Sequence, residues 1–571
     1  MGNFIKTQSS FANGEIAPDF YTNDNLNGLS KLLNMDVTAG GGLTRRGGLA
    51  PVAALGAATR LVPFSVSESD EYMLALSDGH IHIYSNGTHI QDISAPWTSG
   101  DIDKLQYAQR FGTMIFVHPD YQPRILTRVA NGFELTLFEF ERSDADMSVH
   151  IPFIRFDDTT DIKITVSANS TGNNYATFTT SRAFWTTDDL HGRFLLLGHQ
   201  WTITSIDSPT VATAQTNGAY TLPSAPVSDW YETAFSVRRG WPVSITFHQN
   251  RLVFGGSRSY PAGVWMSTVG RHRNFDVGTG LDDQAIFITL LSAQRQQICT
   301  VVGADNLQIL TTVGEWAIAN KPLTPASVDI KQHTSVGSIA SRFLAPQSIE
   351  GATVFVASGG HDIRELCLDD LGENYNANDL CAFAKHLMSS PVDIAYNATS
   401  RQLFVVMASG DMAVLNHNSA LGISAWGTYQ TNGQFKSVAV CGGETFVVVC
   451  RGGNFCLEKF STDAYSDATN IPFRVAAAGV PLRASGHNAA VMRVRKIVAR
   501  VMDTKTLFIN GVRANLPNAV YGENASGFTG DVSVGTLGWT RETFGAPWRI
   551  ETDDTLPITV MSVTMYGNYT L

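Results

Sequence analysis

Short apolar strands separated by turns that contain glycine or aspartate recur along the middle of the chain. One such unit, YMLALSDGHIHIY from Tyr72, has an apolar run, an Asp-Gly turn and a second run in which apolar and polar residues alternate. Asp-Gly between two such runs is a strong signal of a tight hairpin, because these residues accept the positive φ that the turn needs. The same design predicts six further hairpins, which begin at Thr113, Arg251, Asn306, Ala352, Arg401 and Glu444.

The spacing of these hairpins indicates a repeat architecture. Apart from one long interval, neighbouring hairpins begin about 40 to 55 residues apart. Repeats of this length that contain only strands are typical of β-propeller blades. One small sheet cannot bury both of its faces, so neighbouring sheets must stack on each other. We therefore expect an all-β fold, a β-propeller of about seven blades, with six or eight also compatible with the pattern.

The long interval between the hairpins at Thr113 and Arg251 predicts an inserted domain. Residues 140–235 contain segments such as DIKITVSANSTGNNYATFTTS and RFLLLGHQWTITSIDS, which are rich in threonine and alternate with period two. This pattern favours a small β-barrel or sandwich. The insertion divides the propeller into residues 61–139 and 236–465. Insertions between repeats emerge on one face and often carry interactions.

The two ends of the chain depart from the repeat. Residues 1–60 indicate an N-terminal arm with a short helix around Leu26 to Leu33, which either packs on its own domain or reaches a neighbouring subunit. We expect that deletion of residues 1–45 spares the propeller and blocks docking into a ring. Residues 466–571 are rich in strand patterns, include an Asn510-Gly511 hairpin turn and predict a separate C-terminal β domain.

Composition supports strands and limits the choice of partners. The chain has 50 glycines and 21 prolines, is 44% hydrophobic and 16% charged, and carries a net charge of −11. Proteins that grip nucleic acid neutralise phosphates with clustered Lys and Arg, so this balance argues against such binding. It does not exclude a local basic patch or a surface past which nucleic acid slides. One basic run predicts either a solvated strand face or a contact to an acidic partner, and it comprises Arg493, Arg495, Lys496 and Arg500.

The cysteines and the N-terminus contain no localisation or metal signal. The six cysteines match no paired metal-ligand spacing, and we expect most of them to be small buried hydrophobes. The opening MGNFIKTQSSFANG lacks the apolar core of a signal peptide, and no run of 18 apolar residues occurs. We expect a protein that folds in a cytosol and does not insert into a membrane.

A search for catalytic motifs finds no complete site. His80 and His82 lie two apart on one strand face, as two metal ligands could, but no third ligand is evident, which favours exposed hairpin side chains. The acid pairs Asp282-Asp283 and Asp369-Asp370 could bind Ca²⁺ or act as acid and base, yet neighbours on a strand point to opposite faces. Turn or cap roles are favoured for both pairs. Neither SDGHIHIY nor SGDMAVLN completes the Asp-box of propeller sialidases. We therefore predict no catalytic, cofactor-binding or metal-binding residue and a protein that is not an enzyme.

Aromatic residues concentrate between Arg238 and Ile318 and predict the core of two blades. Trp265→Ala is expected to destabilise the fold by about 3 to 5 kcal/mol if the residue is buried. The residues assigned to this core are Trp241, Phe247, Phe254, Trp265, Phe275 and Trp316.

Several longer segments have distinctive amino-acid sequences. The chain opens with FANGEIAPDFYTNDNL and NMDVTAGGGLTRRGG, and its centre contains FVHPDYQPRIL, RRGWPVSITFHQNRLVFGGS, VWMSTVGRHRNF and LDDQAI. These are followed by TTVGEWAI, TSVGSIASRFLAP, GGHDIREL, NDLCAFAKHL and the C-terminal DDTLPITVMSV. In this order they resemble the tail nozzle family (tail tubular protein B) of short-tailed bacteriophages, the podoviruses, and related prophages. The resemblance spans nearly the whole chain, except that the inserted segment is poorly marked.

The resemblance implies a structural virion protein in the viral tail, assembled in the host cytoplasm. Similar nozzles form a homo-hexamer below the portal and its adaptor, the head-to-tail connector. Genomic DNA leaves through the channel without sequence recognition during DNA ejection, and tail fibres or spikes dock nearby. Two alternatives remain: a receptor-binding propeller adhesin, and a glycan-active propeller enzyme of the tail.

Overall fold

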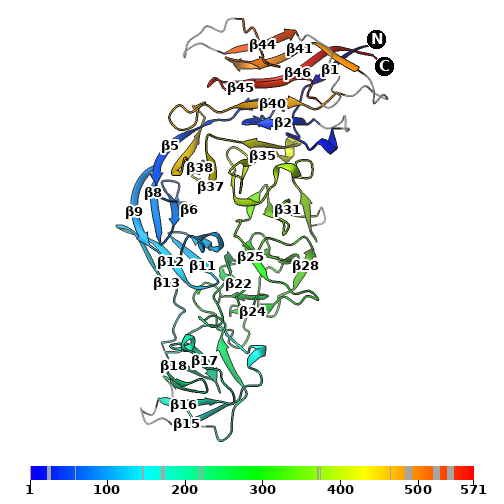
Figure 1. The fold of residues 1–571 in the computed structure, drawn as a ribbon. Helices are drawn as coiled ribbons and strands as arrows, with labels where there is room; N and C mark the ends of the chain where they lie inside the picture. Colours follow the sequence, from blue (N-terminus) through cyan, green and yellow to red (C-terminus); the bar gives the residue numbers. More distant parts are fainter. Residues whose placement is uncertain are drawn as a thin grey trace. The chain divides into compact units, whose positions relative to one another are not determined.

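The computed structural model describes most of the chain. It covers residues 2–570 apart from 22–26, 58, 145–146, 169–173, 218–219, 222, 370–371, 373, 463, 483–490, 518–526 and 536–544. The chain divides into two compact units, one of Met1–Ile102 with Leu344–Leu571 and one of Asp103–Phe343. Within these described ranges the regular structure consists of strands and a few 3₁₀ turns, without an α-helix, which confirms the predicted all-β class (Figure 1).

The first unit contains four antiparallel blades of four strands each. Three are separate sheets, whereas β33–β36 are the first four strands of a nine-stranded sheet. Each of three blades uses consecutive strands, whereas the fourth, β37–β38–β39, takes its last strand, β5, from the start of the chain. The first blade has β6 (Arg60–Ser67), β7 (Asp70–Ser77), β8 (His80–Ser85) and β9 (Thr88–Ser94), and the second has β29 (Gln347–Ile349), β30 (Ala352–Val356), β31 (Ile363–Leu368) and β32 (Tyr375–Asp379). The third has β33 (Pro391–Asn397), β34 (Gln402–Met407), β35 (Met412–Asn418) and β36 (Ile423–Tyr429), and the fourth has β37 (Gln434–Cys441), β38 (Glu444–Arg451), β39 (Asn454–Ser461) and β5 (Gly48–Leu55).

The second unit contains three blades and the inserted domain. Its blades are again four-stranded and antiparallel. They consist of β10 (Gln106–Arg110), β11 (Thr113–His118), β12 (Tyr121–Val129) and β13 (Gly132–Leu137); β21 (Ser244–His248), β22 (Arg251–Gly255), β23 (Gly263–Met266) and β24 (Ile286–Thr289); and β25 (Ile298–Gly303), β26 (Leu307–Thr311), β27 (Glu315–Ile318) and β28 (Ile330–Thr334).

Within each unit, the first strands of successive blades lie against one another. In the first unit β29 contacts β33, β33 contacts β37 and β37 contacts β6, and in the second β10 contacts β21 and β21 contacts β25. Polar side chains reinforce these contacts, because Asp393 Oδ2 accepts from the backbone N–H of Val438 (3.0 Å) and Ser437 Oγ accepts from that of Leu61 (2.9 Å). Stacked four-stranded blades of this kind make the fold a β-propeller, as predicted.

The seven predicted hairpins are the two central strands of the seven blades. The hairpin from Tyr72 is β7–β8, and that from Arg251 is β22–β23. The other five correspond to β11–β12, β26–β27, β30–β31, β34–β35 and β38–β39. The central strands are nearly fully buried, which explains their continuous apolar runs.

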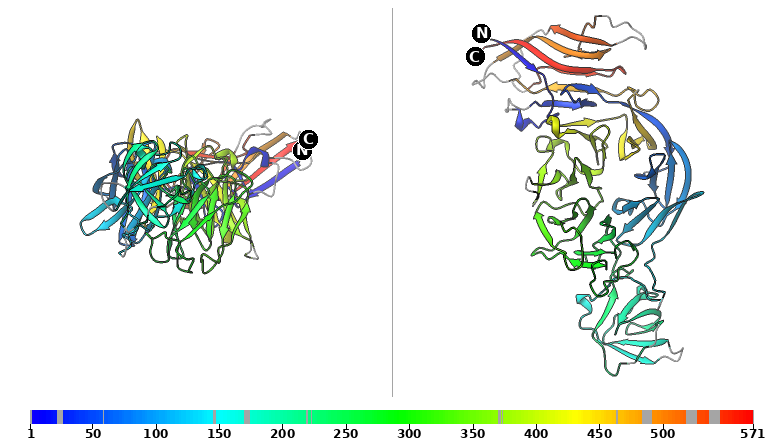
Figure 2. Two further views of the ribbon diagram at one scale, coloured as in Figure 1. Left: turned by 90° about the horizontal axis from the view of Figure 1, so that it is seen from below. Right: turned by 180° about the vertical axis from the view of Figure 1, so that it is seen from behind.

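The inserted domain is one seven-stranded sheet with its own core. The strand order is β14-β20-β17-β18-β19-β16-β15, and each pair of neighbours is antiparallel. Trp201 and Trp230 are fully buried in a cluster with Phe178 and Phe194. Figure 2 shows the strands β15 to β19 gathered in one body. Their bounds are β14 (Phe153–Ile154), β15 (Ile164–Ala168), β16 (Tyr175–Thr180), β17 (Arg193–Leu196), β18 (His199–Ser208), β19 (Val211–Gln215) and β20 (Trp230–Thr233).

The C-terminal β domain incorporates the start of the chain. One of its sheets pairs β1 with β46 in register, so the two ends of the chain lie side by side (Figures 1 and 2). A second sheet continues blade strand β36 through β2 into β40 and β45, the first contact being parallel. The strands of these layers are β1 (Gly2–Gln8), β2 (Leu29–Leu33), β3 (Met35–Val37), β4 (Leu43–Arg45), β40 (Val475–Gly479), β41 (Val491–Thr504), β42 (Phe508–Ile509), β43 (Val512–Arg513), β44 (Phe528–Gly535), β45 (Arg549–Thr552) and β46 (Thr559–Thr570).

One expectation for the N-terminal arm is wrong. Of the helix predicted around Leu26 to Leu33, residue 26 lies outside the described part, and Leu29–Leu33 form strand β2 because both neighbours in the sheet supply backbone partners. That deletion of residues 1–45 spares the propeller stays a prediction, although the deletion would remove Phe11, Leu29 and Leu32, which are fully buried in the terminal core. The predicted Asn510-Gly511 turn is confirmed, and both residues have positive φ (50° and 76°).

Candidate functional site

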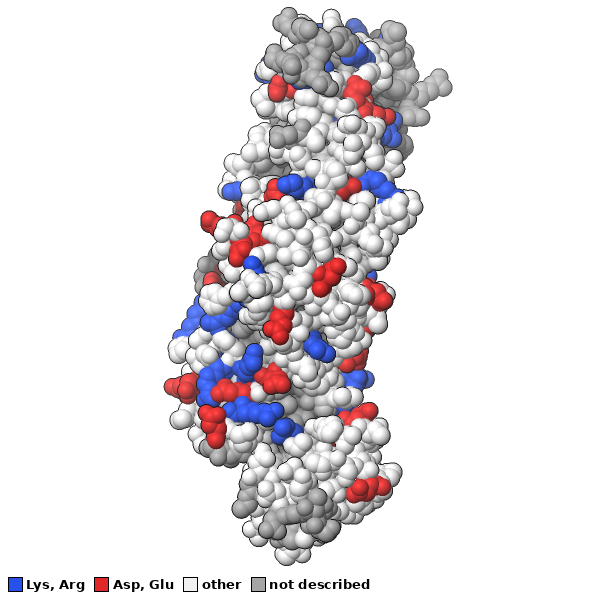
Figure 3. All heavy atoms as spheres, turned by 90° about the vertical axis from the view of Figure 1, so that its left-hand side faces the viewer, with Lys and Arg blue, Asp and Glu red and all other residues white. Residues whose placement is uncertain are grey.

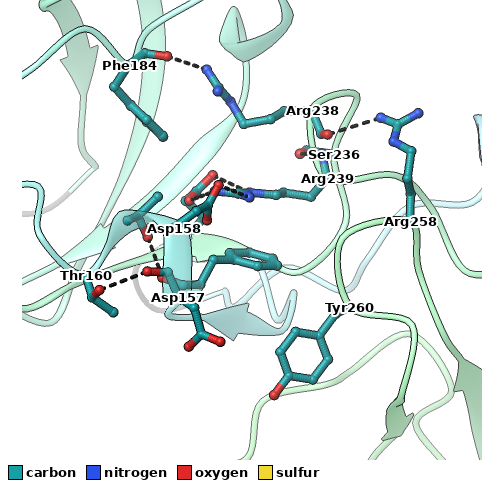
Figure 4. Close-up of polar contacts among 12 residues, drawn as sticks. Asp157, Asp158, Thr160, Phe184, Ser236, Arg238, Arg239, Arg258 and Tyr260 are labelled. Carbon is teal, nitrogen blue, oxygen red and sulfur yellow. Dashed lines mark hydrogen bonds and ion pairs between the residues drawn. The ribbon is translucent and has the colours of Figure 1, made fainter. Parts of the chain in front are cut away.

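The strongest polar constellation of the second unit lies where the chain leaves the inserted domain. Arg238 and Arg239 follow the last strand of that domain, β20, and precede the blade strand β21. Figure 4 shows their side chains pointing back toward the inserted domain from the loop that ends it. These arginines belong to the segment RRGWP, so the sequence drew attention to them without indicating their partners.

Arg238 holds the 3₁₀ turn at Thr187–Asp189. Its Nε donates to Asp189 Oδ1 (2.6 Å), its Nη2 donates to the carbonyl of Phe184 (2.6 Å), and its guanidinium lies 4.3 Å from the centre of the Phe184 ring. Burial opposes the charge, but the hydrogen bond and the negative charge of Asp189 raise the pKa of Arg238 above its ordinary value. The arginine therefore stays charged and fixes this turn against the junction.

Arg239 is more deeply buried and joins three segments. Its Nε donates to Glu232 Oε2 (2.9 Å), and its Nη1 donates to Asp158 Oδ2 (3.0 Å). The guanidinium also lies 4.0 Å from the ring centre of Phe156. Arg239 is 5% and Glu232 8% exposed, so this is a buried ion pair with additional hydrogen bonds. Loss of one partner from such a pair is costly, because the other charge stays buried alone.

Arg258 connects the same junction to the blade. It extends from the turn between β22 and β23, where its Nη2 donates to the carbonyls of Val237 (2.6 Å) and Arg238 (3.1 Å) and its Nη1 to Asp120 Oδ1 (3.0 Å). Gly240 makes room for it: φ there is +84°, and a Cβ would lie 2.6 Å from the Cβ of Arg258. We call Arg238, Arg239 and Arg258 with their acidic partners the junction clamp. Its geometry can hold the inserted domain in place, and it contains no nucleophile with an activating base.

A polar cavity of about 320 Å³ is lined by the segment before β14, by strands β17 to β19 and by Asp276. The side chain of Gln200 closes one wall by donating to and accepting from the backbone of Val149, at 2.9 Å each. Arg193 is half-buried and forms no ion pair with any residue that the structure describes; burial, followed by the positive charge of Arg142, lowers its pKa. The cavity can therefore hold a small polar or anionic ligand. Its lining also includes His150, Phe153, His199, Thr202, Gln215 and Asn217.

The acid pairs do not form a site. Asp282 and Asp283 are exposed in a turn, as favoured by the sequence, and their backbone carbonyls accept from Arg251. Asp369 accepts from the backbone of Asn374 within its loop, and Asp370 lies outside the described residues.

The histidines follow a different pairing from the predicted one. His82 and His89 both contact the Oδ1 atom of Asp92, whereas His80 bonds to the carbonyl of Asp78. The sequence pattern indicated only His80 and His82, and missed His89 and Asp92 because they lie on the next strand.

The remaining residues singled out in the sequence have structural surroundings. Trp265 is 1% exposed and, with the other assigned aromatics, belongs to or packs against blade cores, as predicted. In the basic run, Arg500 pairs with Asp531 across the sheet, and a register shift at Arg495 interrupts the alternation. Three cysteines are buried (Cys299, Cys381 and Cys441) and three are half-buried (Cys367, Cys450 and Cys456).

Comparison with known proteins leaves the family open. No family model and no curated protein matches the chain. Among solved structures, it is similar to BamB from Moraxella catarrhalis (10% identity, TM-score 0.34), covering 72% of this chain and 98% of that one. It is also similar to the Cps50 (Swd1) β-propeller domain of Myceliophteria thermophila (8%, TM-score 0.37; 72% and 100%) and to the RRP9 WD40 repeats (8%, TM-score 0.34; 73% and 100%). Values this low carry no conclusion about function. No described helix has the length and apolar character needed to cross a membrane.

Proposed function

We propose that this chain is a structural subunit of a phage tail nozzle: a homo-hexameric ring in the virion that docks below the portal-adaptor, passes the genome and carries fibres or spikes. The proposal rests on the resemblance of the ordered segments to the nozzle family. One structural observation supports it most: segments that carry the resemblance bind one another through sets of hydrogen bonds and ion pairs within blades, which we call polar brackets.

The first bracket joins RRGWPVSITFHQNRLVFGGS to LDDQAI. Arg251 is fully buried, and its guanidinium donates to the carbonyls of Asp282 (2.8 Å), Gln284 (2.6 Å) and Ser267 (2.7 Å). Burial lowers the pKa of this arginine, and no carboxylate bonds to it among the described contacts. A buried cation whose hydrogen bonds go to carbonyls of a loop fixes the course of that loop, because the charge needs these acceptors to stay buried.

The second bracket joins TTVGEWAI to TSVGS. Glu315 is 1% exposed and accepts from the hydroxyl of Thr334 and from the backbone N–H of Val336 (3.3 Å). Burial raises the pKa of this carboxyl above its ordinary value, although its hydrogen bonds oppose the rise. The shape of the loop after β28 therefore depends on one carboxyl group of β27.

The third bracket joins GGHDIREL to NDLCAFAKHL through four charged groups. Lys385 Nζ lies 3.0 Å from both Asp362 and Asp379, and Arg364 lies 3.2 Å and 3.7 Å from the same two carboxylates. These carboxylates are saturated by cations of the chain itself. These segments therefore fix loops of the blades, which is compatible with a structural wall protein.

Charge distribution is compatible with passage of DNA. The net charge is −11, and on the face of Figure 3 positive side chains gather in the lower part beside negative ones. A wall with few unopposed cations binds phosphates weakly, so a duplex would not be retained by it.

Mass measurement tests the proposal. Native mass spectrometry of the purified chain, alone and mixed with its portal-adaptor, should give a species of about six times 61.9 kDa, with a ring and central channel in electron micrographs. A chain that stays monomeric with the adaptor present contradicts the nozzle function.

Receptor binding is a second candidate, favoured by the polar cavity beside Arg193. A host surface polysaccharide retained by the wild-type protein and released by Arg193→Gln would support an adhesin. Equal retention by both proteins would leave the cavity without this role.

A further inference from the structure

A bulge in the outer strand of the first blade brings two histidines and one aspartate together. On β8 and β9, His82 lies opposite Asp92 and Tyr84 lies opposite His89, with a register shift between these two pairs. His89 and Asp92 are three apart, so a regular strand would place them on opposite faces. The extra residue of the bulge reverses that parity and turns both side chains to the face of His82.

The three side chains converge on one point. Asp92 Oδ1 lies 2.6 Å from Nδ1 of His82 and 2.7 Å from Nε2 of His89, and the potential ligand atoms all lie within 4.8 Å of one another. They are 29%, 47% and 52% exposed for His82, His89 and Asp92, so their positions can adjust and an ion can reach them.

The donor set suits a transition metal. Two imidazole nitrogens and a carboxylate, with a further position open to water, are ligands that Zn²⁺ uses in tetrahedral sites. Bonds of about 2.0 to 2.1 Å place tetrahedral ligand atoms roughly 3.3 Å apart, so each nitrogen would move about 0.6 Å away from Asp92.

One ligand already has a supporting contact. The second nitrogen of His82, Nε2, lies 2.8 Å from the hydroxyl of Ser77 on β7. A hydroxyl can accept from Nε2–H, and this tautomer presents the Nδ1 lone pair toward Asp92 and His89. Metal-binding histidines commonly have such an outer partner, which orients the ring. Ser77 is 7% exposed and therefore well placed for the role.

We propose that His82, His89 and Asp92 form a binding site for a divalent transition-metal ion of the zinc type, with Ser77 orienting His82. The site lies on the outermost strand of its blade, β9, and its remaining coordination position faces solvent. It is independent of the proposed tail function.

A second cluster of potential ligands is less suited to a metal ion, because cations of the chain already occupy it. Asp362, Asp379 and Cys381 also present ligand atoms within 4.8 Å of one another. Lys385 and Arg364 already neutralise both carboxylates there, so a divalent cation would have to displace two chain cations. The histidine cluster contains no such internal cation.

Zinc binding by matched variants tests the site. The full chain is dialysed against Zn²⁺ and its metal content measured by inductively coupled plasma mass spectrometry, for wild type, His89→Ala, Asp92→Asn and His80→Ala. His80 is the control, because its ring stacks on that of His82 at 6.0 Å but its Nδ1 bonds to a backbone carbonyl. We expect one ion per chain fewer in the first two variants and an unchanged content in the control.

A Co²⁺ titration followed by visible absorption adds the geometry. Tetrahedral d–d bands should appear in the wild type and in His80→Ala, and Ser77→Ala should weaken affinity by about tenfold. Circular dichroism and the thermal midpoint check that each variant is folded, which is expected because these side chains are exposed. If His89→Ala unfolds, the metal content of the conservative variant Asp92→Asn still tests the site. Equal metal content in wild type and both ligand variants would overturn the proposal and identify the cluster as a hydrogen-bonded triad.

Discussion

Substitution of Arg46 by methionine tests how the N-terminal segment is fixed to its unit. Arg46 and Asp467 are both completely buried, and the guanidinium donates to the two carboxylate oxygens at 2.9 and 2.8 Å. It also donates to Asn34 Oδ1 (2.8 Å) and to the carbonyls of Gly47 (2.8 Å) and Gln430 (3.0 Å). Every donor of this side chain therefore has a partner. The partners lie in the N-terminal segment, directly after blade strand β36, and in the loop after β39.

The magnitude follows from what the substitution leaves behind. Methionine fits the space beside Phe473, whose ring centre lies 3.6 Å from the guanidinium carbon, but it donates nothing. Removal of one partner from a buried pair costs about 3 to 5 kcal/mol, and two carbonyls lose a donor at about 1 kcal/mol each. Asn34 keeps a donor from Gln430 (2.9 Å) and so adds little. We expect Arg46→Met to destabilise this region by about 5 to 7 kcal/mol.

Local hydrogen exchange is the appropriate assay, because a chain of several domains does not unfold in a single two-state step. Exchange of amides in β5, β39 and β40 should accelerate in Arg46→Met. The matched control is Arg500→Met: Arg500 makes the same two-bond pair with Asp531, at 2.8 and 3.1 Å, but these side chains are 64% and 51% exposed. Exposed pairs contribute little, so the control should match the wild type.

A double variant separates the lost pair from general damage. Arg46→Met combined with Asp467→Leu removes the stranded carboxylate and should recover at least about 2 kcal/mol of the loss, because buried pairs replaced by apolar groups are often close to neutral. Wild-type exchange in Arg46→Met, or a double variant no better than the single one, would refute the reasoning.

Further substitutions test the core, the junction and the thiols. Trp265→Ala should lower the free energy of unfolding of its blade by about 3 to 5 kcal/mol, as seen in hydrogen exchange of the amides of β22 and β23, and Trp265→Phe by less, since no described group bonds to the indole nitrogen; equal exchange in all three proteins would contradict the burial. Arg239→Gln should speed proteolysis of the junction without altering the blades, and an unchanged digest would show that the clamp is dispensable. The hydrogen bond and charge of Arg271 lower the pKa of Glu141. This pair therefore stabilises the fold at pH values above the ordinary pKa of glutamate, and the stabilisation is lost as the pH falls through the lowered pKa. The thermal midpoints of wild type and Glu141→Gln should converge in acid. Burial raises the pKa to about 12 for the thiols of Cys299 and Cys381 and to about 11 for that of Cys441. Alkylation of the native protein near pH 8, mapped by peptide mass spectrometry, should therefore spare these three thiols. Their rapid alkylation would show that the cores around them open readily.

The central strands of the blades were predictable because burial on both faces imposes a strong local signal. Strands such as β22 (RLVFG) and β30 (ATVFV) are buried throughout, so their sequences are continuous apolar runs between turns. The first and fourth strands carry weaker patterns; β28 reads IKQHT and is largely polar. Blades could therefore be counted from the sequence, but their full width could not.

Long-range pairing was beyond the sequence for a different reason. Strand β5 completes the sheet of β39, and β1 pairs with β46, yet each pair is separated by most of the chain. Nothing in GLAPVAAL specifies which edge it joins, because β-pairing depends on backbone groups that every residue has. The same limit explains why a helix was predicted for Leu29–Leu33. Five residues with three leucines suit a helix or a strand equally well, and two neighbouring strands decide for the strand.

The polar residues show the limit most clearly. Arg46, Arg239 and Arg251 are buried, which is rare for arginine, and the sequence pattern did not indicate it. The structure places all three at 5% exposure or less with their hydrogen bonds directed to the chain itself, so their purpose is to fix loops. His89 and Asp92 lie in an ordinary outer strand, and only a bulge turns them toward His82. In this fold, the unusual sequence segments contribute to the scaffold. The candidate metal site becomes visible only once the register between two strands is known.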